Sequence, residues 1–268
     1  MTCGNEMSRV RRPLLPRPSL RFIPVWRRNL RVWRKLMMPS LLGNFGEPVL
    51  YLLAFGYGFG RLVGELEGMS YMVFIASGII CSSAMFTASF EGMYSAYTRM
   101  AEQNTWLAML GTPLTLDDIV FAEAIWAATK GLVSATAILV VASALGLVTD
   151  ARALLALPVV FLAAFTFGSL ALVITAVARS YDFFLYYFTL AVTPMLLLSG
   201  VFFPLQEMPE WVQRLAFALP LAHVVEIVRP LMTGRWPTGV GLHLTVIVSY
   251  GAVALVLATT LIHRRLIR

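Results

Sequence analysis

Apolar residues run together along most of this chain in six long stretches, separated by shorter and more polar segments. A helix needs about 20 mostly apolar residues to cross roughly 30 Å of hydrocarbon, and each stretch is that long. They occupy residues 41–62, 71–94, 119–147, 154–178, 183–203 and 242–262. Lipid offers no partner for backbone amides, and runs that are apolar on both faces do not suit a barrel wall. The predicted fold class is therefore all-α, a polytopic membrane protein with six transmembrane helices.

The segment before the first stretch, residues 22–38, has two faces instead. At 100° per residue, apolar residues that include Trp26 and Trp33 share one side of a helix. The opposite side is basic, with Arg27, Arg28, Arg31, Arg34 and Lys35. This pattern is typical of an amphipathic helix that lies in the plane of the membrane surface, and we predict one here. The alternative is a basic helix that docks on another protein.

Two connections are long enough to hold structure of their own. Residues 95–118 predict a short helix over 102–110, followed by Thr115 and Asp118 in the spacing of a capping box for the third span. Residues 205–241 are unusually apolar for a loop and are interrupted by prolines. They predict two short helices separated by Pro220. Helices too short to span dip into the membrane or cover the mouth of a bundle, so we predict a re-entrant hairpin.

Composition and charge fix the environment and the orientation. The chain is 59% hydrophobic and 13% charged, which fits lipid as the solvent. Its net charge is +7, and the basic residues are unevenly distributed. With six spans, 15 of them lie on the side of the N-terminus and 5 on the other. This bias predicts cytoplasmic termini, an extracytoplasmic hairpin and contact of the basic residues with lipid headgroups, with no role for nucleic acid. Residues 1–18 are predicted to be a disordered cytoplasmic tail, in which Met7 is an alternative start.

The chemistry of an enzyme is missing from the sequence. It contains no phosphate-binding Gly-x-x-x-x-Gly-Lys-Ser/Thr loop, no Gly-x-Ser-x-Gly turn and no His-Glu-x-x-His helix. His223 and Glu226 lie one helical turn apart but have no third ligand in the pattern, so no metal is predicted. A serine protease that uses Ser199 and His223 is a remote alternative. We expect no catalytic residue and no cofactor on this chain.

Four ionisable residues fall within the predicted spans, namely Glu47, Glu91, Glu123 and Lys130. Such residues are costly in lipid and often mark function. The three glutamates lie near the cytoplasmic boundary, whereas Lys130 is deep. Pairing of Lys130 with a carboxylate is the structural interpretation, and an ion-coupled secondary transporter is the functional alternative.

Three segments together resemble the membrane permeases of type-2 ATP-binding-cassette exporters, and within them the nodulation protein J group. They are Asn44-Phe45-Gly46-Glu47-Pro48 with the aromatic-rich run after it, Met109-Leu110-Gly111-Thr112-Pro113-Leu114, and Leu198-Ser199-Gly200-Val201-Phe202-Phe203-Pro204 continuing to Arg229-Pro230-Leu231. The resemblance covers residues 19–268, which it defines as one transmembrane domain. The third segment is the most specific, because it combines a glycine break, paired phenylalanines and a proline-marked hairpin.

The resemblance implies a permease that forms a homodimer and docks two copies of a separate, NodI-like ATPase, which would hold the ATP and Mg²⁺. The implied ATPase-coupling residues are Arg31, Lys35, Arg99, Glu102 and Trp106. The implied extracytoplasmic gate comprises Gly200, Phe202, Phe203, Pro204 and His223. The implied cargo is an amphipathic glycolipid or lipo-oligosaccharide, although related permeases that look similar move polysaccharides or hydrophobic drugs.

Overall fold

The computed structural model describes residues 16–35, 37–58 and 60–266, and most of them are helical. Almost all of the predicted tail, residues 1–18, lies outside the described residues. The elements are α1 (Phe22–Lys35), α2 (Met37–Gly58), α3 (Gly60–Val63), β1 (Glu65–Leu66), β2 (Met69–Ser70), α4 (Tyr71–Phe90), the π-helical turns η1 (Glu91–Ser95) and η2 (Thr98–Glu102), α5 (Thr105–Leu110), α6 (Leu116–Ala144), the 3₁₀ turn η3 (Ala151–Leu155), α7 (Ala156–Val177), α8 (Asp182–Tyr187), the π-helical turn η4 (Phe188–Val192), α9 (Thr193–Leu198), the 3₁₀ turn η5 (Leu205–Glu207), α10 (Glu210–Ala218), α11 (Pro220–Met232) and α12 (Val240–Leu266).

Four of the described helices are long and apolar enough to cross a membrane. They are Tyr71–Glu102, in which α4 continues through η1 and η2, then Leu116–Ala144, Ala151–Val177 and Val240–Leu266. These helices match the second, third, fourth and sixth predicted stretches. The two short helices expected on either side of Pro220 are α10 and α11, which are bent by 93° from each other and make a fifth crossing only if they are counted as one broken span.

The first and fifth predicted stretches give less regular helices. The first corresponds to α2, which has 22 residues but carries Asn44, Glu47 and two prolines, so its apolar character is weaker. The fifth corresponds to the 17-residue range 182–198, where α8, η4 and α9 follow one another. The described residues therefore contain helices at all six predicted positions, and four of these helices meet the length and apolarity of a span.

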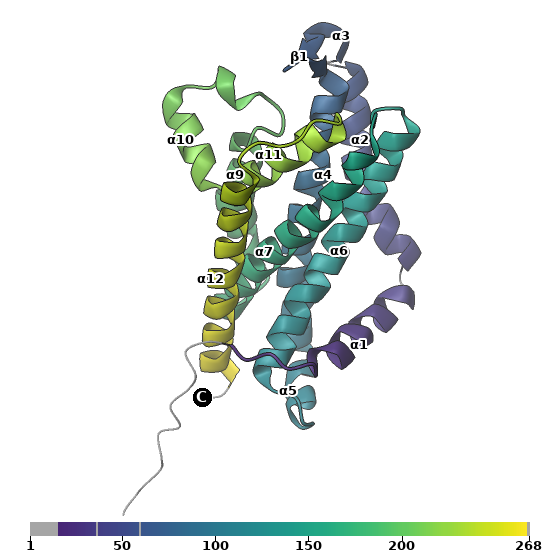
Figure 1. The fold of residues 1–268 in the computed structure, drawn as a ribbon. Coiled ribbons are helices and arrows are strands. Elements are labelled where there is room, and N and C mark those ends of the chain that lie inside the picture. The colour runs from purple at the N-terminus through teal and green to yellow at the C-terminus, as the bar shows by residue number, and fades with distance from the viewer. Residues whose placement is uncertain (1–15, 36, 59, 267–268) are drawn as a thin grey trace, which may run out of the picture.

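The core is built around α4, which has α6 and α7 beside it (Figure 1). Small residues let these helices approach closely. A Cβ added to Gly131 of α6 would lie 2.6 Å from Cβ of Ala164 on α7, and one added to Gly168 of α7 would lie 2.7 Å from Cβ of Ala127. Packing of this kind leaves no room for a single extra methyl group.

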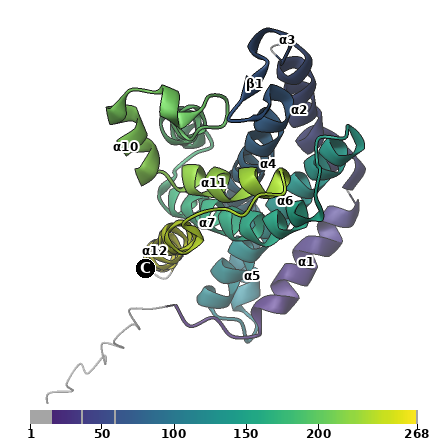
Figure 2. The same cartoon turned by 45° about the horizontal axis from the view of Figure 1, so that its top comes forward.

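The elements gather at two ends of the bundle. One end carries α1, α5 and the C-terminal end of α12, and we call it the α5 end (Figure 1). The other carries α3, the β1–β2 hairpin, α10 and α11, and we call it the α11 end. Figure 2 shows α11 lying across the ends of the long helices. The two strands were not predicted, because strands of two residues have no hydrophobic period to read.

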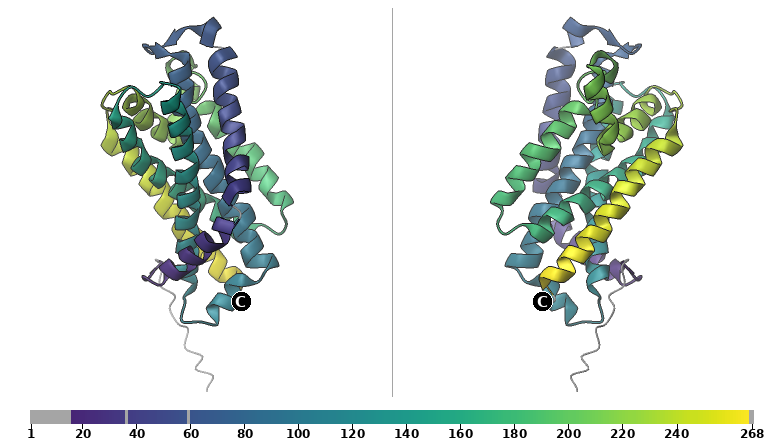
Figure 3. Two further views of the ribbon diagram at one scale, coloured as in Figure 1. Left: turned by 90° about the vertical axis from the view of Figure 1, so that its right-hand side faces the viewer. Right: turned by 90° about the vertical axis from the view of Figure 1, so that its left-hand side faces the viewer.

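Most of the predicted segment 22–38 forms the helix α1, and several of its apolar side chains pack within the chain. Phe22 packs edge-on against Phe121 of α6 at 5.0 Å, and Trp33 packs against Trp126 at 6.2 Å. Val25 between them is buried. Figure 3 shows α1 running obliquely at the α5 end. Over these residues the apolar side of α1 packs against α6, and its position in the plane of the membrane stays a prediction.

Candidate functional site

A cluster of four ionisable side chains lies inside the protein near the α5 end, and we call Glu91, Arg99, Glu123 and Lys130 the ionic cluster. Arg99 binds Glu123 with two hydrogen bonds, from Nη2 to Oε2 at 2.6 Å and from Nε to Oε1 at 3.0 Å. The same Nη2 donates to Glu91 Oε1 at 2.9 Å. Glu123 and Glu91 are only 1% and 5% exposed. The cluster is thus a buried arrangement of two carboxylates around one guanidinium.

Lys130 completes the charge balance, because its Nζ lies 3.5 Å from Glu91 Oε2. The structural interpretation of Lys130 as the partner of a carboxylate is confirmed. Glu91 also accepts hydrogen bonds from Trp126 Nε1 at 2.8 Å and from Ser95 Oγ at 3.0 Å. Both carboxylates are fully engaged, which offsets part of the large cost of burying their charge.

Two further donors connect the cluster to α1 and α5. Trp106 Nε1 of α5 donates to Glu123 Oε1 at 3.3 Å, and Asn29 Nδ2 of α1 donates to Glu123 Oε2 at 3.3 Å. The Asn29 side chain is oriented by Arg28, whose Nη1 donates to Asn29 Oδ1 at 3.1 Å. Glu123 therefore links three separate elements of the chain through one carboxylate.

The surroundings of Arg28 show the electrostatics of this region. Partial burial lowers the pKa of Arg28, the nearby Arg99 lowers it further, and Glu123 opposes both effects. Arg28 belongs to the basic face of α1, whose other members Arg27, Arg31, Arg34 and Lys35 are exposed. Arg28 alone on this face turns toward the cluster.

The backbone that carries Glu91 and Arg99 is itself irregular. The chain is π-helical over Glu91–Ser95 and again over Thr98–Glu102. A π-helical turn inserts one residue into the helical register, and such turns are frequent at functional sites. The residues directly before α5 are strained as well, since Asn104 has a φ of 51°. The long helix therefore ends at Glu102, and only 105–110 of the predicted helix 102–110 form α5.

The start of α6 confirms the predicted capping box. Thr115 Oγ1 accepts from the backbone N–H of Asp118, and Asp118 Oδ2 accepts from the backbone N–H of Thr115 at 3.1 Å. Asp118 Oδ1 also accepts from the backbone N–H of Ser19 at 2.6 Å and from Ser19 Oγ at 2.9 Å. The segment that leads into α1 is thereby fixed to the first turn of α6.

The five expected coupling residues separate into two groups. Trp106 is fully buried and the Arg99 side chain is only 14% exposed, so neither presents its polar group to a partner protein. Both hold the ionic cluster inside the chain, and their role in ATPase coupling stays a prediction. Glu102, Arg31 and Lys35 are exposed at the same end of the molecule. These three remain available for a partner.

At the α11 end lies Arg229, which was not among the predicted site residues. Its side chain is 7% exposed and lies over the ring of Phe74, with Cζ 3.6 Å from the ring centroid. Nε donates to Ser77 Oγ at 3.1 Å, and Nη2 donates to the Gly200 carbonyl at 2.5 Å. Nη1 lies 3.9 Å from Glu67 Oε2. Arg229 thus joins α11 to α4, to the loop after α9 and to the β1–β2 hairpin.

The expected gate residues lie around that loop. Gly200 has a φ of +73°, in the left-handed region that glycine adopts at little cost. Phe202 packs against Phe55 of α2 at 5.5 Å between ring centroids. Pro204 is buried, whereas Phe203 is 57% exposed. The loop is therefore held by contacts on both sides, with one phenylalanine free of them.

His223 is buried and lies against a second histidine. Its Nε2 is 2.9 Å from the Phe217 carbonyl, which requires a hydrogen on Nε2. Its Nδ1 is 2.7 Å from Nδ1 of His243 on α12, and when the His223 ring is neutral this nitrogen is the acceptor. Within the described part of the chain no group of three metal-ligating side chains is found. Ser199 Oγ has no hydrogen-bond partner there, so His223 does not activate it as the protease alternative required.

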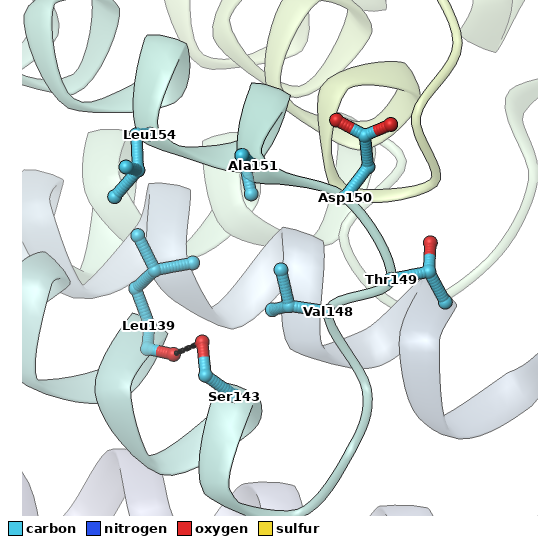
Figure 4. Close-up of a pocket in the computed structure, with 8 residues that line it drawn as sticks. Leu139, Ser143, Val148, Thr149, Asp150, Ala151 and Leu154 are labelled. Atoms are coloured by element: carbon cyan, nitrogen blue, oxygen red, sulfur yellow. Dashed lines mark hydrogen bonds between the residues drawn. The ribbon is translucent and has the colours of Figure 1, made fainter.

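Two other features stand apart from these contacts. The side chain of Glu47, the fourth predicted intramembrane ionisable residue, lies outside the described residues. A cavity of about 300 Å³ lies where α6 passes into α7, with Leu139, Val148 and Leu154 around it and Thr149 and Asp150 at its edge (Figure 4). Ser143, which also lines it, donates to the Leu139 carbonyl of its own helix. This cavity has no contact with the ionic cluster.

Some residues of the ionic cluster and of the Arg229 site were recognisable from the sequence pattern. Glu123, Trp126 and Lys130 share one face of α6, so Trp126 was recognisable as a neighbour of the charges. Arg229 interrupts an apolar run in α11, which marks a buried cation in need of partners. Asn29 had no such signal, because it lies among basic residues on α1.

Comparison with known proteins gives a consistent assignment. The family model described as ABC-2 type transporter matches residues 21–233. The chain is 46% identical to nodulation protein J of Rhizobium leguminosarum bv. viciae, over 95% of this chain and 98% of the relative. It is 43% identical to nodulation protein J of Rhizobium meliloti (strain 1021), over 94% and 96%. It is 27% identical to the inner membrane transport permease YadH of Escherichia coli (strain K12), over 74% and 75%.

Proposed function

The chain belongs to the ABC-2 type transporter family, and from this premise we propose that it exports an amphipathic glycolipid or lipo-oligosaccharide from the cytoplasm. Membership makes it a multi-pass membrane protein and the permease subunit of an ABC transporter, whose ATPase is a separate partner. The observation that carries the proposal is the similarity to nodulation protein J over 95% of the chain. ATP and Mg²⁺ are then bound by the partner, and no cofactor is bound by this chain.

The proposed assembly contains two copies of this chain and two copies of a NodI-like ATPase in the bacterial inner membrane. The α5 end faces the cytoplasm, with both termini on that side, and the α11 end faces outward. In this arrangement α2 and the 182–198 segment cross the membrane together with the four long helices, giving six spans. The 15-to-5 distribution of basic residues supports this orientation.

We place the ATPase contact on the exposed residues at the α5 end. Glu102, Arg31 and Lys35 provide charges of both signs, and Leu107 of α5 adds an apolar side chain that is 48% exposed. Movement imposed on α5 or α1 reaches α6 through Trp106, Asn29 and the Glu123 carboxylate. The ionic cluster is proposed to make these elements move as one unit, since breaking a buried ion pair is strongly unfavourable.

We place the outer gate at the loop 199–204 and the α10–α11 pair. Phe202 closes against Phe55, and His223 holds α11 to α12 through His243. Opening requires at least one of these contacts to separate. The hairpin would then be re-entrant, as its bend of 93° and its short helices allow.

The ion-coupled alternative loses its main support. A proton-coupled carrier needs a buried carboxylate that exchanges protons, but Glu91 and Glu123 are each held by Arg99 and by further donors. Export of a polysaccharide or a hydrophobic drug by the same machinery stays an alternative for the cargo alone.

Transport in proteoliposomes tests the proposal. The chain is reconstituted with its partner ATPase, and ATP-dependent movement of a fluorescent acylated chitin oligomer is compared with that of the same oligomer without its acyl chain. We expect only the acylated oligomer to be transported. Substitution of the Walker lysine in the partner ATPase should abolish this transport. Transport that persists with the inactive ATPase would overturn the proposal. Equal transport of both oligomers would show that the cargo need not be amphipathic.

A further inference from the structure

A small cavity at the α11 end borders the proposed outer gate, and the proposed transport cycle assigns no ligand to it. It has a volume of about 120 Å³ and lies between the β1–β2 hairpin, η5 and α11. Half of its eight lining residues are charged, two of each sign: Glu67, Glu226, Arg229 and Arg235. Gln206 adds an amide. We call it the hairpin cavity.

The hairpin brings one carboxylate and one carbonyl over the two arginines. Glu67 and Gly68 form its two-residue turn, and both have positive φ, at 52° and 71°. Glu67 Oε2 then lies 3.9 Å from Arg229 Nη1, and the Gly68 carbonyl accepts from Arg235 Nη2 at 3.5 Å. Both distances are longer than a strong ionic hydrogen bond. Arg229 and Glu67 therefore form a long ion pair without a direct hydrogen bond between them.

Two of these side chains keep unused hydrogen-bonding capacity. Arg229 is more than nine-tenths buried, yet among the described residues only its Nε and Nη2 have hydrogen-bond partners, and Nη1 has none within hydrogen-bond distance. Glu226 is partly buried, and its carboxylate has no hydrogen bond or ion pair in the same described part of the chain. Arg229 Nη1 has only the long ion pair with Glu67, and Glu226 interacts with Arg229 by charge alone, so both keep hydrogen-bonding capacity that a bound molecule can satisfy.

The balance of charge selects the class of molecule. An anion alone would meet two carboxylates, and a cation alone would meet two guanidinium groups, so each would be repelled by half of the lining. A neutral sugar would lack a stacking partner, because none of the eight lining residues is aromatic. At 10–15 Å³ for each water-sized occupant, the cavity holds about ten non-hydrogen atoms. A small group that carries both a phosphate and an ammonium fits this size and this charge.

We propose that the hairpin cavity binds a phosphoethanolamine group, with its phosphate on Arg229 and Arg235 and its ammonium on Glu226 and Glu67. The group comes either from a phosphatidylethanolamine lipid or from free phosphoethanolamine. The site lies beside the Arg229 contact with Gly200, so its occupant stabilises the closed form of the loop after α9. This inference does not depend on which cargo is exported.

Native mass spectrometry of the delipidated permease–ATPase complex tests the site. Short-chain phosphatidylethanolamine, phosphatidylglycerol and phosphatidylcholine are added at equal concentrations. We expect phosphatidylethanolamine to be retained at least tenfold more strongly, because only it carries both a phosphate and an ammonium with N–H donors. Glu226→Gln and Arg235→Gln should each reduce its retention about tenfold, the loss expected for one hydrogen bond to a charged group. Glu210→Gln, which affects the exposed Glu210–Arg214 pair on α10, is the matched control and should change nothing.

Added phosphoethanolamine separates the two sources. Displacement of the lipid by millimolar phosphoethanolamine means that the headgroup alone binds, whereas retention without displacement means that the lipid is the ligand. Either result supports the site. Equal retention of phosphatidylglycerol, or full retention by Glu226→Gln at an unchanged Tm, overturns it. The readout is binding without ATP, so it is independent of the transport assay.

Discussion

Arg99 and Glu123 lie 24 residues apart in the sequence and form a two-point ion pair in the interior, with Nη2 2.6 Å from Oε2 and Nε 3.0 Å from Oε1. Arg99 lies in the last turn of the long helix that contains α4, and Glu123 lies about two turns inside α6. Because Glu123 also accepts from Asn29 and Trp106, this pair is the point at which α1, α4, α5 and α6 meet.

Replacing one partner of the Arg99–Glu123 pair should lower stability more than replacing both partners together. Glu123→Gln leaves the Arg99 guanidinium buried without its main counter-charge, and the expected loss of stability is about 3–5 kcal/mol. Replacing both partners, as Arg99→Met with Glu123→Leu, should cost less than the sum of the single changes by more than about 1 kcal/mol, as neighbouring residues do. Thermal unfolding of the purified complex measures both quantities. Strict additivity of the two changes would show that the pair contributes no coupling.

The Asn29 contact should matter for transport more than for folding. Asn29→Ala removes one hydrogen bond to Glu123, with an expected stability loss of about 1.5–3 kcal/mol. Asn29→Asp should be worse than alanine, since it places a second carboxylate beside Glu123. If α1 moves with α6 through this bond, export per ATP hydrolysed falls in both variants. Val32→Ala, an exposed position on the same helix, is the control and should leave that ratio unchanged.

Charge reversal should lower export at both the exposed Glu102 and the buried Arg99, but it should lower stability only at Arg99. Glu102→Lys is expected to lower export and ATPase association with a change in stability within about 0.5 kcal/mol, as for other exposed positions. Arg99→Glu should lower the amount of folded protein as well, because it puts three carboxylates together. Export and Tm are measured for both. Normal export by Glu102→Lys would move the partner surface away from this residue.

Close packing of α6 against α7 predicts a position-specific effect of one methyl group. Gly131→Ala would place Cβ 2.6 Å from Cβ of Ala164, and the expected cost is about 1–3 kcal/mol of overpacking. Gly241, in the first turn of α12, has nothing within 4 Å of its added Cβ. Gly241→Ala should therefore stabilise by about 0.4–1 kcal/mol. Equal Tm changes for the two variants would mean that the helices are further apart than described.

Sequence patterns located most of the helices but not their contacts. Apolar runs gave α4, α6, α7 and α12 because lipid exposure forces long uninterrupted helices, and the spacing of Thr115 and Asp118 gave the cap of α6. The same patterns left open which carboxylate pairs with Lys130, since Glu91 and Glu123 both lie within reach of its span. They also suggested that the apolar face of α1 meets lipid, because an apolar face looks the same whether lipid or α6 covers it.

The hairpin end was harder to predict for a physical reason. Its contacts join residues far apart in the chain, as Arg229 does with Phe74, Ser77 and Gly200. None of these contacts repeats at a helical or strand period. An arginine in an apolar helix is predicted to need hydrogen-bond partners. The sequence does not predict which carbonyl or aromatic ring contacts it.

The most direct test of the central claim is to identify what copurifies with the chain. The C-terminus is tagged, membranes are extracted in mild detergent, and the complex is analysed by mass spectrometry and mass photometry. The account predicts a stoichiometric ATP-binding-cassette ATPase in a complex sized for two permeases and two ATPases. A monomer or homodimer without an ATPase, stable under several gentle extractions, would contradict the proposed assembly.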